Sequence, residues 1–265
     1  MAVLVLTFSK KKCILIGMKP YEHIKEFSMK YCDVDFKDEA KLSTVLAYLE
    51  EVACSSADEL GFGYSFVKPR GYAFMVTNIC CEFLQPIPLG ETVVVKTWPN
   101  PPSHVIFGRE YQILAPSGTL YMNASSRWCL VDMQTGKLLQ SKVIDNQDYD
   151  SYNPAKAIEN VRWKIPTLKR EEAELKFTIT IANSEYDHNM HVNNTRYADY
   201  FLNCFSVAEL AERKLKRVLI SYVRQCREGE TLRFYRQHQE DGSYLICGFN
   251  EADEVVAQAS VAFEE

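Results

Sequence analysis

The sequence predicts an α+β protein built as a tandem repeat, in which two antiparallel sheets each curl around one long central helix. Two observations lead to this prediction. A helix-like segment followed by several strand-like segments occurs twice in the same order. A Gly-Glu-Thr turn also precedes a strand-like run in each half, at residues 90–92 and 229–231. A helix with a broad apolar face has to be buried, and a sheet is the surface that the sequence offers for it.

The first half contains a helix pattern and four strand patterns. Its apolar helix residues recur at the i, i+3, i+4 and i+7 spacing of a single helix face, and they are Leu42, Val45, Leu46, Leu49, Val52 and Ala53. The strand patterns are rich in apolar and β-branched residues and cover residues 74–83, 93–98, 106–114 and 120–132. We expect this N-terminal domain to span residues 18–139.

The second half repeats this order. Its helix pattern has the same spacing and consists of Tyr197, Tyr200, Phe201, Cys204 and Phe205. Its strand patterns cover residues 218–226, 232–235, 244–249 and 254–264. Placing Asp33 on Asp187 brings the two helices into approximate coincidence. We expect this C-terminal domain to span residues 171–265.

Two further segments have no place in the repeat. Residues 1–17 are expected to be an N-terminal extension, or to precede the natural start at Met18. Their apolar run is shorter than the roughly 20 residues of a membrane span, and its lysines follow it, whereas a secretory signal places positive charge first. Residues 140–170 lack sustained periodicity and contain two prolines, so they are expected to link the domains.

The composition limits the classes of function. The chain has 30 basic and 35 acidic residues, a net charge of −5, and therefore no overall basic field to hold a nucleic acid. Its nine cysteines include no C-x-x-C pair, which favours reduced thiols in a cytoplasmic protein over a disulfide framework or a zinc site. The common phosphate-binding, zinc-protease and serine-nucleophile motifs do not occur. The sequence predicts no cofactor, no metal and no insertion into a membrane.

One segment of the second half resembles a known family. Residues 187–194, Asp-His-Asn-Met-His-Val-Asn-Asn, followed by Tyr197, resemble the D-x-N-x-H-V-N-N-x-x-Y motif of fatty acyl-ACP thioesterases. The resemblance extends to residues 33–35, 90–99 and 128–137, and spans almost the whole chain. It implies two hotdog domains, each a sheet around a central helix. It also implies hydrolysis of the thioester between a fatty acyl chain and acyl carrier protein, which ends fatty acid synthesis. The chain length and the lack of a transit peptide fit the bacterial members.

The motif supplies three candidate catalytic groups. Asp187, Asn189 and His191 are spaced by two, so in an extended segment their side chains point to one side, away from His188 and Met190. We expect water to attack the thioester, with Asp187 or His191 as general base and Asn189 orienting the carbonyl or the water. The sequence does not decide between the two bases.

The start of the following helix is a candidate oxyanion site. Asn193 and Asn194 are both good helix caps, so we expect the helix to begin near them. The free N–H groups and the positive dipole end of that helix would then stabilise the developing oxyanion.

The chain departs from the family at one position. The family usually carries a Glu-Cys pair where this chain has Gln225-Cys226. An amide cannot accept the proton of water, so we expect Gln225 to position the water only. Cys226 could act as a nucleophile paired with His191, but a small buried strand residue is the favoured interpretation.

The first half is expected to bind the acyl chain. In the alignment of Asp33 with Asp187, Lys37 takes the place of His191, so this half lacks the imidazole. The apolar candidates for the chain pocket are Leu49, Val52, Phe74 and Met75, each of which could equally be part of the ordinary core.

Three alternatives remain open on the sequence. An acyl-CoA thioesterase would use the same phosphopantetheine arm, and a basic cluster facing the acidic carrier protein would distinguish the two. The candidates for that cluster are Lys164, Lys169, Arg170, Arg213, Lys214, Lys216 and Arg217. A protein that binds acyl thioesters without catalysis is compatible with Gln225. A hotdog hydratase is disfavoured, because no second histidine matches its Asp/His pair. The sequence leaves a homodimer open.

Overall fold

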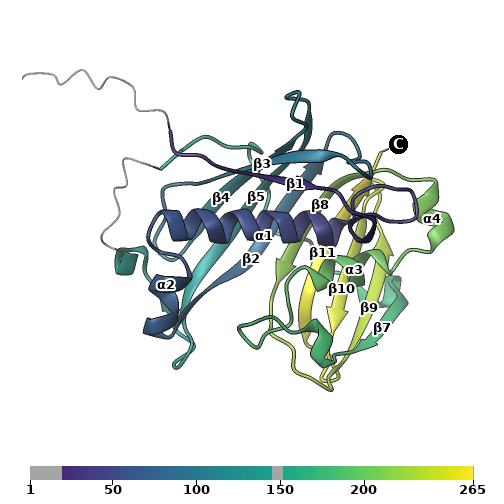
Figure 1. Ribbon diagram of the computed structural model, residues 1–265. Helices are drawn as coiled ribbons and strands as arrows, with labels where there is room; N and C mark the ends of the chain where they lie inside the picture. Colours follow the sequence, from purple (N-terminus) through teal and green to yellow (C-terminus); the bar gives the residue numbers. More distant parts are fainter. Residues whose placement is uncertain (1–19, 145–151, 265) are drawn as a thin grey trace, which may run out of the picture.

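The strands of the protein form one continuous antiparallel sheet. The computed structural model describes residues 20–144 and 152–264, so the predicted extension at 1–17 lies outside the described residues. The sheet has 11 strands in the order β1-β3-β4-β5-β2-β8-β11-β10-β9-β7, and β6 pairs with β5. Figure 1 shows α1 lying across the strands of the first half and α3 against those of the second. Across the described ranges, no helix has both the length and the apolar character that a membrane span requires.

The first half contains the long helix that the sequence predicts. Helix α1 (Leu42–Glu59) has 18 residues, and the apolar side chains of the predicted face are buried. The strands are β1 (His23–Ser28), β2 (Tyr72–Phe83), β3 (Thr92–Pro99), β4 (Phe107–Leu114), β5 (Leu120–Asp132) and β6 (Leu138–Leu139). Short helices lie at η1 (Tyr31–Asp33), α2 (Tyr64–Val67), η2 (Lys68–Arg70) and η3 (Ser141–Ile144).

The second half has a shorter helix than expected. Helix α3 (Arg196–Leu202) ends before Cys204, and α4 (Val207–Ala211) follows. The predicted helix is interrupted there because a capping box starts a new one. The Ser206 Oγ accepts the Glu209 N–H, and the Glu209 carboxylate accepts the Ser206 N–H. The other elements are η5 (Arg170–Glu172), β7 (Glu174–Thr180), η6 (Asn183–Glu185), β8 (Leu215–Tyr222), β9 (Thr231–His238), β10 (Tyr244–Phe249) and β11 (Val255–Phe263).

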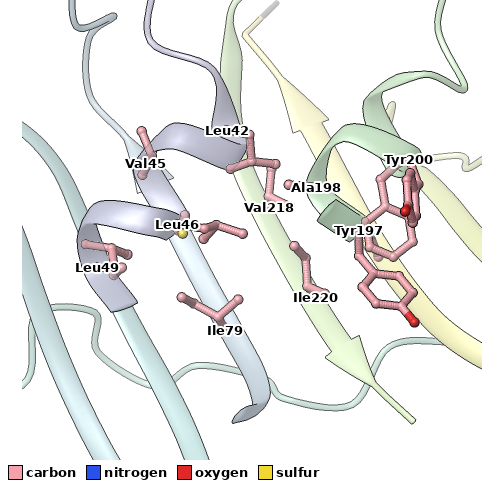
Figure 2. Close-up of a cluster of buried hydrophobic side chains, with 14 of the residues drawn as sticks. Leu42, Val45, Leu46, Leu49, Ile79, Tyr197, Ala198, Tyr200, Val218 and Ile220 are labelled. Atoms are coloured by element: carbon pink, nitrogen blue, oxygen red, sulfur yellow. The ribbon is translucent and has the colours of Figure 1, made fainter. Parts of the chain in front are cut away.

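The two halves are joined by the pairing of β2 with β8. The register runs from Asn78 opposite Ser221 to Glu82 opposite Arg217, so the two expected sheets are one. Beneath the helices, Ile79 of β2 and Ile220 of β8 meet apolar residues of both α1 and α3 (Figure 2). The main core is therefore shared between the halves, and α1 contacts α3 directly.

The repeat also extends to the loop before each helix, in a register that differs from the expected one. Asp35 N–H donates to Glu39 O at 2.7 Å, and Asp187 N–H donates to His191 O at 2.8 Å. Each loop carries a positive φ, at Asp38 and at Met190. Asp187 therefore corresponds to Asp35, two residues beyond the expected Asp33. The expected alignment is therefore wrong by two residues, because helix spacing does not reveal the hydrogen bonds by which the two loops correspond.

The segment after residue 151 covers the sheet face opposite the helices. Ile158, Ile165 and Leu168 are buried against Cys80 and Leu219. Neighbouring residues in a strand point to opposite faces, and Ile79 and Ile220 face the helices, so this segment packs on the other side. The connecting chain thus closes a second layer of core.

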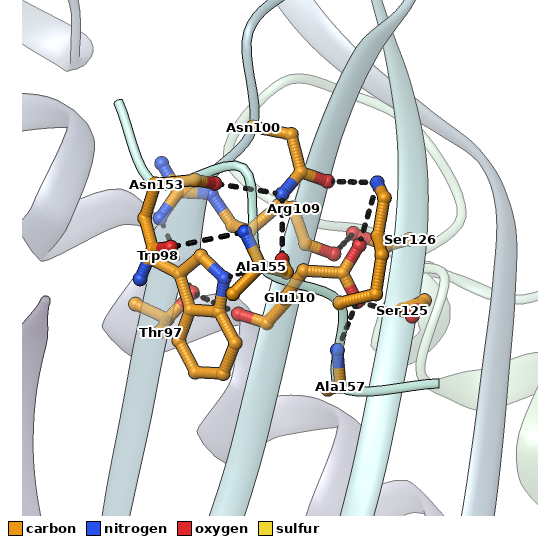
Figure 3. Close-up of polar contacts among 11 residues, drawn as sticks. Thr97, Trp98, Asn100, Arg109, Glu110, Ser125, Ser126, Asn153, Ala155 and Ala157 are labelled. Atoms are coloured by element: carbon orange, nitrogen blue, oxygen red, sulfur yellow. Dashed lines mark hydrogen bonds and ion pairs between the residues drawn. The ribbon is translucent and has the colours of Figure 1, made fainter. Parts of the chain in front are cut away.

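A buried carboxylate fastens this segment to the sheet (Figure 3). Glu110 is 2% exposed and accepts hydrogen bonds from the Ser125 hydroxyl and from the Ala157 N–H at 3.1 Å. Its other oxygen lies 3.1 Å from the Lys156 ammonium, which also donates to Asn100 Oδ1 at 2.6 Å. A buried charge needs such partners, because its transfer from water is otherwise costly.

We expect Glu110→Ala to lower the free energy of unfolding by about 2–3 kcal/mol, because it leaves the Ser125 hydroxyl and the Ala157 N–H without their acceptor and removes the ion pair with Lys156. Urea unfolding measures this as a lower midpoint at an unchanged m-value. Glu26→Ala, an exposed glutamate on β1, is the control and should change the midpoint little. Equal midpoints for the two variants would show that Glu110 does not fasten the segment.

Candidate active site

A cavity of about 490 Å³ lies between α1 of the first half and the 187–195 loop of the second. This volume falls within the range of about 300–1,000 Å³ that small-molecule sites occupy. Helix α1 contributes Ala47, Glu50, Ala53, Cys54 and Ala57. The loop contributes His188, Asn189, Asn193 and Thr195. Aromatic side chains at Phe62, Phe74, Phe107 and Trp128 form much of the remaining wall.

The motif loop is a tight turn and not an extended segment. One carboxylate oxygen of Asp187 accepts the N–H of Asn189 at 2.8 Å and the N–H of His191 at 3.1 Å. The turn removes the expected alternation of side chains. His188, expected on the opposite side from Asn189, lines the cavity beside it while remaining exposed, whereas Asp187 and His191 are not among the residues of its wall. The Asp187 carboxylate shapes the loop.

His191 and Gln225 also hold the backbone of this loop. His191 Nδ1 lies 2.8 Å from the Asn189 carbonyl oxygen, and a carbonyl can only accept, so Nδ1 carries the hydrogen. The exposed Gln225 donates from Nε2 to the Met190 carbonyl at 3.2 Å. The structure therefore brings Asp187, Asn189, His191 and Gln225 together, with Asn189 facing the cavity.

Several N–H groups at the start of α3 already have acceptors. The helix begins at Arg196, slightly later than expected. Asn193 Oδ1 accepts both the N–H and the hydroxyl of Thr195 at 2.8 Å, and the Asn193 N–H donates to Glu185. The Arg196 N–H donates to the Asn193 carbonyl. The N–H groups of Asn193, Thr195 and Arg196 are thus engaged within the protein, and the oxyanion role expected for the helix start near Asn193 and Asn194 stays a prediction.

Asn189 offers a donor to the cavity instead. Asn189 lies in the wall, and among the described residues no hydrogen bond engages its side-chain amide. Its backbone is fixed on both sides, by Asp187 at the N–H and by His191 at the carbonyl. An unengaged amide on a fixed backbone in the cavity wall is suited to stabilising a developing negative charge.

Glu50 is the residue of this site that the sequence reasoning missed. Its Oε2 accepts a hydrogen bond from the Asn194 amide at 3.2 Å. Burial raises the pKa of the Glu50 carboxyl, the hydrogen bond from Asn194 opposes this, and the charge of Asp187 adds to it. A signal was present in the sequence: Glu50 lies four residues after Leu46 and three before Ala53, beside the apolar face of the helix.

Of the apolar residues expected around the acyl chain, Phe74 lines the cavity. Leu49 and Val52 are fully buried in the main core beneath α1. Met75 follows Phe74 in β2 and therefore points to the opposite face of the sheet. The wall also contains the buried Arg109, whose guanidinium donates to the Ser56 hydroxyl at 2.9 Å.

The cysteines near the site are poor nucleophiles. Cys226 is fully buried, accepts a hydrogen bond from the Tyr197 hydroxyl at 3.2 Å, and is not part of the cavity wall. Burial raises its pKa. Cys54 does line the cavity, but burial raises the pKa of its thiol to about 11. Only the thiolate attacks, so the raised pKa values disfavour both residues as nucleophiles near neutral pH.

A second, smaller cavity of about 220 Å³ occupies the equivalent place between α3 and the first-half loop. The corrected register makes Lys37 the counterpart of Asn189, and Glu39 the counterpart of His191. Lys37 forms an ion pair with Glu39 at 2.9 Å and donates to the Arg213 carbonyl. The same offset places Leu202 where the main cavity has Glu50. The smaller cavity thus has neither the free amide nor the carboxylate.

Metal ligands do not gather in the part of the chain that the structure describes: no group of three or more His, Cys, Asp or Glu side chains there could hold an ion.

Comparison with known proteins identifies the family. The acyl-ACP thioesterase N-terminal domain matches residues 20–146, and the acyl-ACP thioesterase C-terminal domain matches residues 168–265. The chain is 24% identical to the chloroplastic acyl-[acyl-carrier-protein] hydrolase FATB3 of Cuphea viscosissima, over 78% of this chain and 53% of that protein. It thus spans about half the length of that plant relative. It is 28% identical to the putative acyl-CoA thioesterase YneP of Bacillus subtilis, over 50% of this chain and 96% of that protein.

Solved structures have the same architecture. An acyl-ACP thioesterase from Bacteroides thetaiotaomicron superposes with a TM-score of 0.83 at 21% identity, covering 92% of this chain and 98% of that one. The 12:0-ACP thioesterase from Umbellularia californica also gives 0.83, at 16% identity, covering 94% and 99%. The likeness confirms the expected tandem hotdog fold. Since the two family domains match the two halves in order, this chain belongs to the acyl-ACP thioesterase family.

Proposed function

We propose that this protein hydrolyses the thioester of a fatty acyl chain carried on acyl carrier protein, releasing the free fatty acid and ending its synthesis. The observation that carries the proposal is the cavity between α1 and the 187–195 loop. Its aromatic and aliphatic wall suits an acyl chain, and the amide of Asn189 at the loop suits a thioester carbonyl. Membership of the acyl-ACP thioesterase family supports the same activity.

In the proposed mechanism, water attacks the thioester carbonyl while Asn189 donates to its oxygen. The donor has to be held rigidly where charge develops, since that is how such groups lower the barrier. Asp187 and His191 hold the backbone on the two sides of Asn189, and Gln225 holds the carbonyl of Met190. These three residues are therefore assigned a positioning role, with Gln225 fixing the loop and not a water molecule.

An acyl-CoA substrate is the second candidate, favoured by the similarity to YneP. Both substrates carry the same phosphopantetheine arm, so surface charge has to distinguish them. Four of the basic residues expected to face a carrier protein, Lys169, Arg170, Lys214 and Arg217, are each paired with a carboxylate. Lys68 instead lies at the cavity itself, and we propose it as a contact for the acidic carrier in the cytoplasm.

We expect Asn189→Ala to lower kcat by about 10²–10³-fold, because it removes the donor to the oxyanion. Release of free thiol from acyl-ACP measures the rate, and circular dichroism checks the fold. Lys37→Ala alters the first-half counterpart of Asn189 and is expected to keep the wild-type rate. Equal losses in the two variants would contradict a single active site at the 187–195 loop.

A panel of matched acyl-ACP and acyl-CoA substrates tests the substrate class. We expect a higher kcat/KM on acyl-ACP than on acyl-CoA. Lys68→Ala should lower kcat/KM more for acyl-ACP than for acyl-CoA. Wild-type protein that binds both substrates but hydrolyses neither would support the non-catalytic alternative.

Cys226→Ala is expected to keep most of the activity, because the buried thiol lies outside the cavity wall. Mass spectrometry of the enzyme during turnover should find no acyl group on the protein. An acyl adduct on Cys226 would overturn attack by water and restore the thiol mechanism.

A further inference from the structure

We propose that Glu50 is the general base of this hydrolysis, supplied by the central helix of the first half to the motif loop of the second. The inference rests on the proposed function and adds a catalytic residue to it. Glu50 and Asn189 line the same cavity from opposite halves of the chain. A water molecule between them can lose a proton to one side while the thioester carbonyl gains a hydrogen bond from the other.

A hydrogen bond from the motif loop holds the Glu50 carboxylate in place. The Asn194 amide donates to its Oε2 at 3.2 Å, and the Tyr222 hydroxyl donates to the Asn194 carbonyl at 3.1 Å. No described residue hydrogen-bonds to the other carboxylate oxygen, Oε1, which can therefore accept a bond from water. The carboxylate is thus fixed by one oxygen and leaves the second for the reaction.

The other acceptors of the loop are less suited to this role. Asp187 already accepts two backbone N–H groups on one oxygen and is not part of the cavity wall. His191 is not part of the cavity wall. Gln225 carries no titratable group. His188 does line the cavity, but its side chain is exposed and packs edge-on against Tyr64.

The environment of Glu50 also makes its carboxylate more basic. Burial raises its pKa, and the negative charges of Asp187 and Glu51 act in the same direction. The Asn194 amide and the neighbouring His188 oppose that rise. A base with a raised pKa takes a proton from water more readily than an ordinary exposed glutamate does.

The proposed step balances in atoms and charge. The Glu50 carboxylate takes one proton from water as the water oxygen bonds to the thioester carbon, which gives a tetrahedral oxyanion held by Asn189. The carbon–sulfur bond then breaks, and the proton on Glu50 passes to the departing sulfur. The products are the free thiol of the carrier and a fatty acid, which loses its own proton to solvent.

The repeat supplies an internal comparison. Leu202 occupies the position equivalent to Glu50 in the smaller cavity, and Lys37 replaces Asn189 there. The two residues assigned to the chemistry are therefore absent together from the other half. A structural role for Glu50 alone would not require this joint loss.

The test compares Glu50→Gln with wild type on acyl-ACP. The substitution keeps the shape and the acceptor for Asn194 but removes the base, so kcat should fall by 10²-fold or more, within the range of a general base, with little change in KM. Glu50→Asp should recover part of the rate. Glu59→Gln, on the same helix but outside the cavity wall, is the matched control and should keep the wild-type kcat.

Two further readouts separate catalysis from structure. The wild-type kcat/KM should fall as the pH drops through the raised pKa of Glu50, because protonation removes the base, and Glu50→Gln should lose this limb. Because the folded state raises this pKa, the ionised carboxylate destabilises the fold above it, and the neutral amide removes that cost. The Tm of Glu50→Gln at pH 8 should therefore equal or exceed that of wild type.

Each contrary result has a distinct meaning. A Glu50→Gln variant that keeps more than half of the wild-type kcat overturns the assignment of Glu50 and leaves the hydrolase proposal standing. A large loss in His188→Asn with none in Glu50→Gln assigns the base to His188 instead. Wild-type protein without turnover on acyl-ACP or acyl-CoA overturns the proposed function, and the role of Glu50 with it.

Discussion

The pairing of β2 with β8 determines where every functional group of this protein lies, because it joins two repeats into one sheet with a shared core. Backbone hydrogen bonds run across this junction from Asn78–Ser221 to Glu82–Arg217, and Arg217 adds an ion pair to Glu82 at 3.5 Å. The pairing removes two exposed strand edges and sets α1 beside α3. As a result, each central helix faces the loop of the other half.

Because each helix faces the loop of the other half, the fold contains two related cavities, which differ in the residues that line them. In the larger one, the loop of the second half presents Asn189, and the facing helix presents Glu50. In the smaller one, the loop residue Lys37 is held in an ion pair, and the facing helix presents Leu202. The fold thus supplies a duplicated scaffold, while a few substitutions concentrate the polar groups on one side of the junction.

The sequence predicted the elements well and their relations less well. Helix α1 follows its apolar spacing, whereas α3 ends early because the capping box at Ser206 overrides the apolar pattern. The motif is evident in the sequence, but the predicted directions of its side chains are wrong. Two N–H groups donate to Asp187 and fold the segment into a turn, whereas the prediction assumed an extended segment. The place of Glu50 beside the apolar face of α1 is a local signal, but its contact with Asn194 depends on a loop far along the chain, which helix spacing does not reveal.

The proposed active site is shared between α1 and the motif loop. A crystal structure with a non-hydrolysable acyl-pantetheine amide tests it most directly. We expect the acyl chain to lie in the cavity along Phe74 and Trp128. The amide carbonyl oxygen should lie about 3 Å from Asn189 Nδ2, with a water molecule between Glu50 and the carbonyl carbon. An analogue seated in the smaller cavity beside Lys37 and Leu202, or a carbonyl remote from Asn189, would contradict it.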